Sequence, residues 1–99
     1  MQITEAHKKA CRKLGHALKP VVTIGSAGLT DALITEFNTS IEHHELMKVK
    51  VNASSREERD KIIEKICAQT HSTLIQRVGN MALLLKLRPA RDSKLLSQI

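Results

Sequence analysis

The sequence predicts an α/β fold, a two-layer sandwich in which helices cover a mixed four-stranded sheet. Segments with an apolar period of 3.6 residues alternate with short β-branched runs, giving the order α-β-α-β-α-β-β. Right-handed crossovers place the helices on the sheet, and only Gly79-Asn80, a hairpin signal, separates the last two runs. With 99 residues the chain has room for one core. A single domain is therefore expected over residues 1–90, with a C-terminal tail at 91–99.

The first helix is predicted over residues 4–18, because its apolar side chains gather on one arc. Gly15 weakens this helix, and the stretch from Gly15 to Pro20 marks its exit. The first strand follows at Val21–Ile24. The arc opposite the apolar one is basic and comprises Lys8, Lys9, Arg12, Lys13 and His16.

A second helix is expected from Thr30 to His43, with the Thr30 hydroxyl as N-cap. The second strand, Leu46–Asn52, alternates apolar residues with Lys48 and Lys50. This alternation predicts one buried face and one basic face in contact with water.

The third helix starts near Ser54 or Ser55, because each is followed three residues later by Glu, the capping-box spacing. Strands at Leu74–Val78 and Met81–Arg88 form the hairpin, and Pro89 ends the second of them. The tail from Ala90 alternates charged and small residues, a pattern typical of a mobile end. Three apolar residues of the tail give it an alternative, docked state: Leu95, Leu96 and Ile99.

The charge of the chain is unevenly distributed. Lys and Arg number 16 against 10 Asp and Glu, a net charge of +6, and the basic residues concentrate towards both ends. Residues 21–47 contain no Lys or Arg and four acids: Asp31, Glu36, Glu42 and Glu45. This pattern predicts a basic face for a polyanion and an acidic back. The simpler alternative is a soluble protein that is merely basic.

Between the first strand and the second helix lies Gly25-Ser26-Ala27-Gly28, a GxxG spacing. Glycine permits a tight turn, and the following helix start presents unpaired N–H groups, so the backbone amides of Ser26 to Leu29 are candidate phosphate donors. The hydroxyls of Ser26 and Thr30 are further candidates. The simpler reading is a plain strand-to-helix turn.

The runs at residues 18–22 (LKPVV), 24–30 (IGSAGLT) and 43–50 (HHELMKVK) resemble the YhbY/CRM-domain family in its stand-alone bacterial form. The resemblance implies a fold similar to the C-terminal domain of bacterial translation initiation factor three. It also implies RNA binding through the GxxG loop and the adjoining basic surface, and association with precursors of the large ribosomal subunit. Ala27 departs from the Asn, Lys or Arg that many relatives place there, so backbone amides carry more of the expected contact.

The predicted RNA-binding residues fall into a loop set and a basic set. Lys19 precedes the first strand, away from the loop, and the two strand lysines are secondary candidates. The alternative for the basic helix arc is an ordinary solvated face, but Glu5 is its only acid, which favours a phosphate-facing role. The full set is Gly25, Ser26, Ala27, Gly28, Thr30, Lys8, Lys9, Arg12, Lys13, Lys19, Lys48 and Lys50.

Several classes of function are not expected. No catalytic or nucleotide motif is present, so the chain is predicted to be a non-enzyme without cofactor, metal or small-molecule substrate. His43-His44 is interpreted as structural, because neighbouring helical side chains diverge by 100°. Phe37 is the single aromatic residue, so the protein should contact the RNA backbone and recognise RNA shape instead of stacking aromatic rings on bases.

Cys11 and Cys67 lack the spacing of a disulfide framework and fit a reducing compartment. The start resembles no signal peptide and no apolar run is long enough to cross a bilayer, so a cytoplasmic protein without a membrane partner is expected. Two rival functions stay open: a module that docks on a ribosomal protein through its acidic or basic helix, and a small enzyme that uses GxxG for a nucleotide phosphate.

Overall fold

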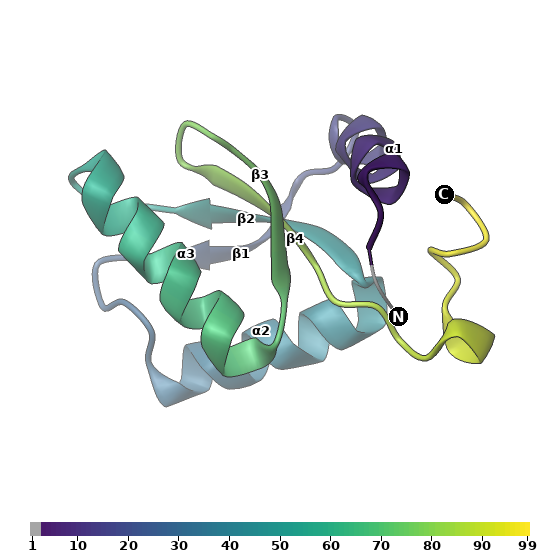
Figure 1. Ribbon diagram of the computed structural model, residues 1–99. Helices are drawn as coiled ribbons and strands as arrows, with labels where there is room; N and C mark the ends of the chain where they lie inside the picture. The colour runs from purple at the N-terminus through teal and green to yellow at the C-terminus, as the bar shows by residue number, and fades with distance from the viewer. Residues whose placement is uncertain (1–2) are drawn as a thin grey trace.

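The computed structural model describes residues 3–99 and forms a mixed sheet with helices on it (Figure 1). Strands β1 and β2 are parallel, whereas β2–β4 and β3–β4 are antiparallel, in the order β1-β2-β4-β3. The predicted element order and mixed four-stranded sheet are confirmed. The elements are α1 (Glu5–Gly15), β1 (Pro20–Ile24), α2 (Asp31–His44), β2 (Leu46–Val51), α3 (Arg56–Thr70), β3 (Thr73–Val78), β4 (Met81–Leu85) and the 3₁₀ turn η1 (Ala90–Asp92).

Side-chain caps fix where the helices begin. The Thr30 hydroxyl accepts the Leu33 N–H at 3.2 Å, and the Ser55 hydroxyl accepts the Glu58 N–H at 3.1 Å. Both predicted N-caps are therefore confirmed, with Ser55 the cap of α3. At α1, Thr4 forms a capping box with His7, which the sequence analysis did not identify.

Two elements end three residues earlier than expected, and β2 ends one residue earlier, at Val51. Helix α1 ends at Gly15, three residues before the predicted end, and β4 ends at Leu85 instead of Arg88. Strand β4 stops there because Leu85 pairs with the first residues of both neighbouring strands, Leu46 and Thr73. Beyond that row the Lys86 N–H still donates to the Glu45 carbonyl at 2.8 Å, but Glu45 is the C-cap of α2 and belongs to no strand, so strand pairing goes no further.

The two faces of the sheet have separate cores. On the first face, α2 and α3 cover a cluster that includes Phe37, Val49 and Leu84. On the second face, α1 and the C-terminal segment cover a smaller cluster that includes Cys11 and Leu83. Figure 1 shows α1 lying apart from α2 and α3. The sandwich of sheet and two helices is thus extended by α1, which covers only part of the second face.

Gly15 lets α1 approach the sheet closely. A Cβ atom at this position would lie 2.6 Å from Cδ2 of Leu83, which is 3% exposed. The glycine that weakened the helix prediction is therefore the contact point of α1 on β4. Any larger residue would displace the helix end or Leu83.

Glu45 is an exception to the predicted acidic back, because it is buried. It follows α2 as the C-cap with φ 64°, and its side chain is 1% exposed. Its carboxylate therefore belongs to the interior, where an unpaired charge would be costly. It accepts hydrogen bonds from Arg88 N (3.0 Å), Ser93 Oγ (2.6 Å), Lys94 N (3.1 Å) and Leu95 N (3.3 Å).

These bonds hold the C-terminal segment on the domain. Leu95 is 7% exposed and packs in the second-face cluster, and Ile99 lies against the same cluster. The Arg88 guanidinium donates to the Glu42 carbonyl at 2.8 Å and so also joins this segment to α2. Of the two expectations for the tail, mobile or docked, the structure shows the docked state.

Candidate nucleic-acid interface

The second face of the sheet carries two cross-strand rows of side chains. Register pairs Lys48 with Leu83 and Leu83 with Gln76, which places these three residues side by side. The next row pairs Lys50 with Met81 and Met81 with Val78. Because side chains alternate between faces, each row points to the side that α1 occupies.

Helix α1 leaves part of this face open. Leu83 is buried beneath Gly15, whereas Val78 is 66% exposed and Met81 is partly exposed. We call the uncovered region the open sheet face; it comprises Lys48, Lys50, Gln76, Val78 and Met81. Both predicted strand lysines lie on it, as the alternation of the second strand indicated.

The exposed side of α1 continues this region. Its side chains Lys9, Arg12 and Lys13 form no ion pair with any of residues 3–99, whereas Lys8 pairs with Glu5 at 3.7 Å. The three free residues line a shallow hollow of about 600 Å³ together with Gln76 of the open sheet face. Four of the predicted basic residues are thus on one helix, but the charge of Lys8 is partly compensated.

The GxxG segment forms a closed turn. The Gly28 N–H donates to the Gly25 carbonyl at 3.0 Å, and Gly28 has φ 72°. The Gly28 amide, expected as a phosphate donor, is therefore already used. Within the described part of the chain, the amides of Ser26, Ala27 and Leu29 have no acceptor. A Cβ atom at Gly25 would touch nothing within 4 Å, so the turn is open to a ligand.

The loop and the basic helix do not adjoin. The loop follows the carboxyl end of β1, and α1 lies towards the other end (Figure 1). Five strand residues separate them, roughly 16 Å at the usual rise. Lys48 and Lys50 lie between, and exposed Lys19 is on the α1 side. The open sheet face therefore lies between the GxxG loop and the basic residues of α1.

The helices on the first face, α2 and α3, carry no excess of basic residues. The acids of α2 that remain exposed are Asp31, Glu36 and Glu42, and the acidic and basic residues of α3 balance in number. Glu42 also forms an ion pair with Lys86 at 3.7 Å. Asp31 begins α2 beside the GxxG loop and is the acid nearest to it in sequence. The predicted basic face and acidic back therefore correspond to the two sides of the sheet.

The remaining features concern the adjacent histidines, metal-ligating side chains, membrane spans and thiols of the described residues. The rings of His43 and His44 meet edge to face with centroids 4.9 Å apart, and residues 3–99 contain no group of three side chains suited to a metal. In the same region no helix has the length and apolar character needed to cross a bilayer. Both thiols are free, and burial raises the pKa of Cys11 and of Cys67.

Comparison with known proteins identifies the family. Residues 3–86 match the model of the CRS1/YhbY (CRM) domain. The chain belongs to the CRM domain family. This family is non-enzymatic, in agreement with the prediction of a non-enzyme.

Full-length bacterial relatives of this CRM chain carry RNA-binding names. A probable RNA-binding protein of Pseudomonas aeruginosa is 37% identical over 99 residues, covering 100% of this chain and 94% of the relative. An RNA-binding protein of Haemophilus influenzae is 34% identical, covering 94% and 92%. A probable RNA-binding protein of Bacillus subtilis is 30% identical, covering 85% and 88%.

The fold of the CRM chain also matches a solved structure. The solution structure of a hypothetical protein from Staphylococcus aureus superposes with a TM-score of 0.78, covering 94% of this chain and 98% of the other. At 24% sequence identity this likeness concerns the fold.

Sequence reasoning missed one residue that the structure brings to the interface. Gln76 reaches the second face because the β3 register shifts between Leu74 and Gln76, leaving Ile75 as an extra residue. Ile75 packs in the second-face cluster while Gln76 lines the hollows beside it. A bulge of this kind changes which face later residues take, and simple alternation along the strand cannot reveal it.

Proposed function

We propose that this CRM-domain protein binds ribosomal RNA in precursors of the large subunit and assists ribosome assembly in the cytoplasm. Its relatives named as RNA-binding proteins support the nucleic-acid class. The observation that carries the proposal is the excess of basic side chains on the α1 side of the sheet, opposite a layer in which α2 has three exposed acids and the acids and cations of α3 balance in number. Ribosomal proteins at the same assembly site are further proposed partners.

The proposed contacts are with RNA phosphates along the second face of the sheet. Lys9, Arg12 and Lys13 supply cations at one end, and Lys48 and Lys50 continue the positive surface across the sheet. The unpaired amides of the GxxG loop then hold a phosphate at the far end, as backbone N–H groups at a helix start do in other proteins. Contacts of this kind carry little sequence information by themselves.

The experiment is a salt titration of RNA binding with a matched control. In the test variant, Lys9, Arg12 and Lys13 are replaced by Glu. In the control, three exposed cations of α3 are replaced by Glu, namely Arg56, Lys61 and Lys65. Each variant changes the net charge equally, so a non-specific effect of charge appears in both.

Loss of three phosphate contacts should lower the slope of log K against log salt by about 2 to 3. We expect this decrease in slope, together with greatly reduced affinity, for the α1 variant. Both quantities should change much less in the α3 control. Equal losses in the two variants would contradict a defined interface. A flat salt dependence of the wild type would favour the rival protein-docking function.

The ribosomal part of the proposal needs a separate measurement. Ultraviolet crosslinking in cells, followed by sequencing of attached RNA, should recover precursor ribosomal RNA of the large subunit. The α1 variant, expressed at the same level, should lose these crosslinks. Recovery of unrelated RNAs alone would refute the proposed target while leaving RNA binding intact.

A further inference from the structure

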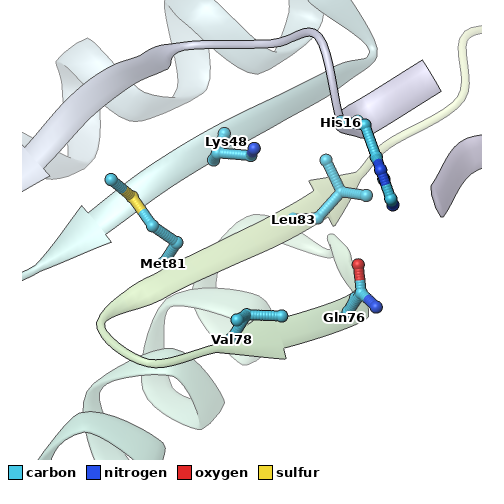
Figure 2. Close-up of a pocket in the computed structure, with 7 residues that line it drawn as sticks. His16, Lys48, Gln76, Val78, Met81 and Leu83 are labelled. Carbon is cyan, nitrogen blue, oxygen red and sulfur yellow. The ribbon is translucent and has the colours of Figure 1, made fainter. Parts of the chain in front are cut away.

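A hollow of about 470 Å³ lies on the second face between the end of α1 and the β3–β4 hairpin (Figure 2). Its volume is in the range of small-molecule sites, with room for a nucleoside-sized group. Residues from the end of α1 and from three strands line it: Gly15, His16, Lys48, Gln76, Val78, Met81 and Leu83.

The order of chemical groups across the hollow follows from strand register. Lys48, Leu83 and Gln76 form one row, so an ammonium and an amide flank an apolar side chain. The row spans two strand spacings, roughly 10 Å. Met81 and Val78 extend the apolar surface towards the hairpin, and Figure 2 shows Lys48 and Gln76 on opposite sides of Leu83. A flat apolar group with polar edges fits this arrangement.

Gln76 and Lys48 are available to a ligand. Neither side chain forms a hydrogen bond or ion pair with any of residues 3–99, and each is partly exposed. An amide presents both a donor and an acceptor, so Gln76 can pair with a base edge that offers the complementary pair. Lys48 offers donors only and suits a phosphate or ribose oxygen.

We propose that this hollow binds one unstacked nucleobase of the RNA, with adenine preferred. The inference rests on the proposed RNA-binding function and deepens it. The base lies against Met81 and the edge of Leu83, and the Gln76 amide pairs with the adjacent amino donor and ring-nitrogen acceptor of adenine. Lys48 contacts the phosphate of the same nucleotide.

The surroundings favour a base over an isolated phosphate. The carboxyl end of α1 forms one wall of the hollow, and a helix end of this kind presents carbonyl groups, not the free N–H groups that hold a phosphate at a helix start. Its floor is apolar, which suits the face of a base. Phe37, the single aromatic residue of the chain, is fully buried in the first-face core and cannot stack on RNA. The hollow therefore replaces an aromatic platform.

The test uses four RNA hairpins that differ only in one bulged nucleotide, A, G, C or U, with affinity measured by fluorescence anisotropy. Wild-type protein should bind the A-bulge hairpin about fivefold to tenfold more tightly than the U-bulge hairpin. Gln76→Leu should reduce this ratio to below about twofold, because it removes the amide that pairs with adenine and so weakens binding of the A bulge most. Gln69→Leu, at an exposed position on α3, is the control and should keep the full ratio.

The outcomes separate the two proposals. Equal binding of all four hairpins by the wild type, or an unchanged ratio in Gln76→Leu, overturns the base site but leaves RNA binding standing. Failure of the wild type to bind any hairpin refutes the proposed function and the base site together.

A second measurement does not depend on a variant folding. In NMR titrations of the wild type, adenosine monophosphate should shift the Gln76 side-chain amide and the Met81 methyl signals. Ribose 5-phosphate at the same concentrations should leave both unchanged. Equal shifts with the two compounds would show that the hollow holds a phosphate, and no shift with either would show that it holds neither; both results overturn the proposal.

Discussion

Replacing Glu45 by Gln should destabilise the protein strongly for so small a change. Each carboxylate oxygen of Glu45 accepts two hydrogen bonds, from Arg88 N and Ser93 Oγ at Oε2 and from Lys94 N and Leu95 N at Oε1. An amide replaces one of these acceptors by a donor, so one or two backbone N–H groups lose their partner.

The expected cost follows from those lost bonds. A buried unpaired donor costs about 1–3 kcal/mol, and the remaining bonds weaken because their acceptor is no longer charged. We therefore expect the free energy of unfolding to fall by about 2–4 kcal/mol, a large part of the stability of a small domain. The assay is urea unfolding followed by circular dichroism at about pH 7. Glu36→Gln, an exposed change on α2, the helix that Glu45 caps, is the control and should alter stability little.

The pH dependence provides a sharper test. Burial raises the pKa of Glu45, but the Ser93 hydroxyl, the backbone amides of Arg88 and Leu95, and the Arg88 charge together lower it below its usual value. A depressed pKa in the folded state contributes stability above the unfolded pKa of about 4.3, and this is lost as the pH falls through the folded pKa. The gap between wild type and Glu45→Gln should therefore shrink at about pH 3. Equal stability of the two proteins, or a gap that stays constant from neutral to acidic pH, would refute the reasoning.

Three further predictions concern α1 and the loop. Gly15→Ala should lower the free energy of unfolding by about 1 kcal/mol, because the clash with Leu83 outweighs the gain in helix propensity. In thermal unfolding, the double variant with Leu83→Ala should lose less stability than the sum of the losses in the two single variants. Ala27→Asp should weaken RNA binding about fivefold without changing the melting temperature, since a surface carboxylate repels phosphate by ~1 kcal/mol; unchanged affinity would count against the loop. Burial raises the pKa of Cys11 and excludes solvent, so alkylation by iodoacetamide should be slow in native protein and fast in urea, and equal rates would contradict its burial.

Part of the candidate site followed from local sequence alone. The alternation of Lys48 and Lys50 with apolar residues predicted their common face, because the period of a strand is fixed at two. The sequence could not show that Lys8 is paired with Glu5 or that the Gly28 amide closes its own turn. Those are contacts between particular atoms, whereas composition and spacing constrain only which residues are near one another along the chain.

The sequence by itself determined the elements, their order, the hairpin and the cap at Thr30, because each depends on residues within a few positions of one another. It left Ser54 and Ser55 as alternatives for the cap of α3, and the structure decided for Ser55. Tertiary structure alone decided that α1 covers the second face, that Glu45 is buried beneath the C-terminal segment, and that a bulge turns Gln76 towards the hollow. Glu45 lies 43 positions from Arg88 in the chain, and their hydrogen bond forms only once the sheet brings the ends of α2 and β4 together. Local propensity contains no information about such a pair.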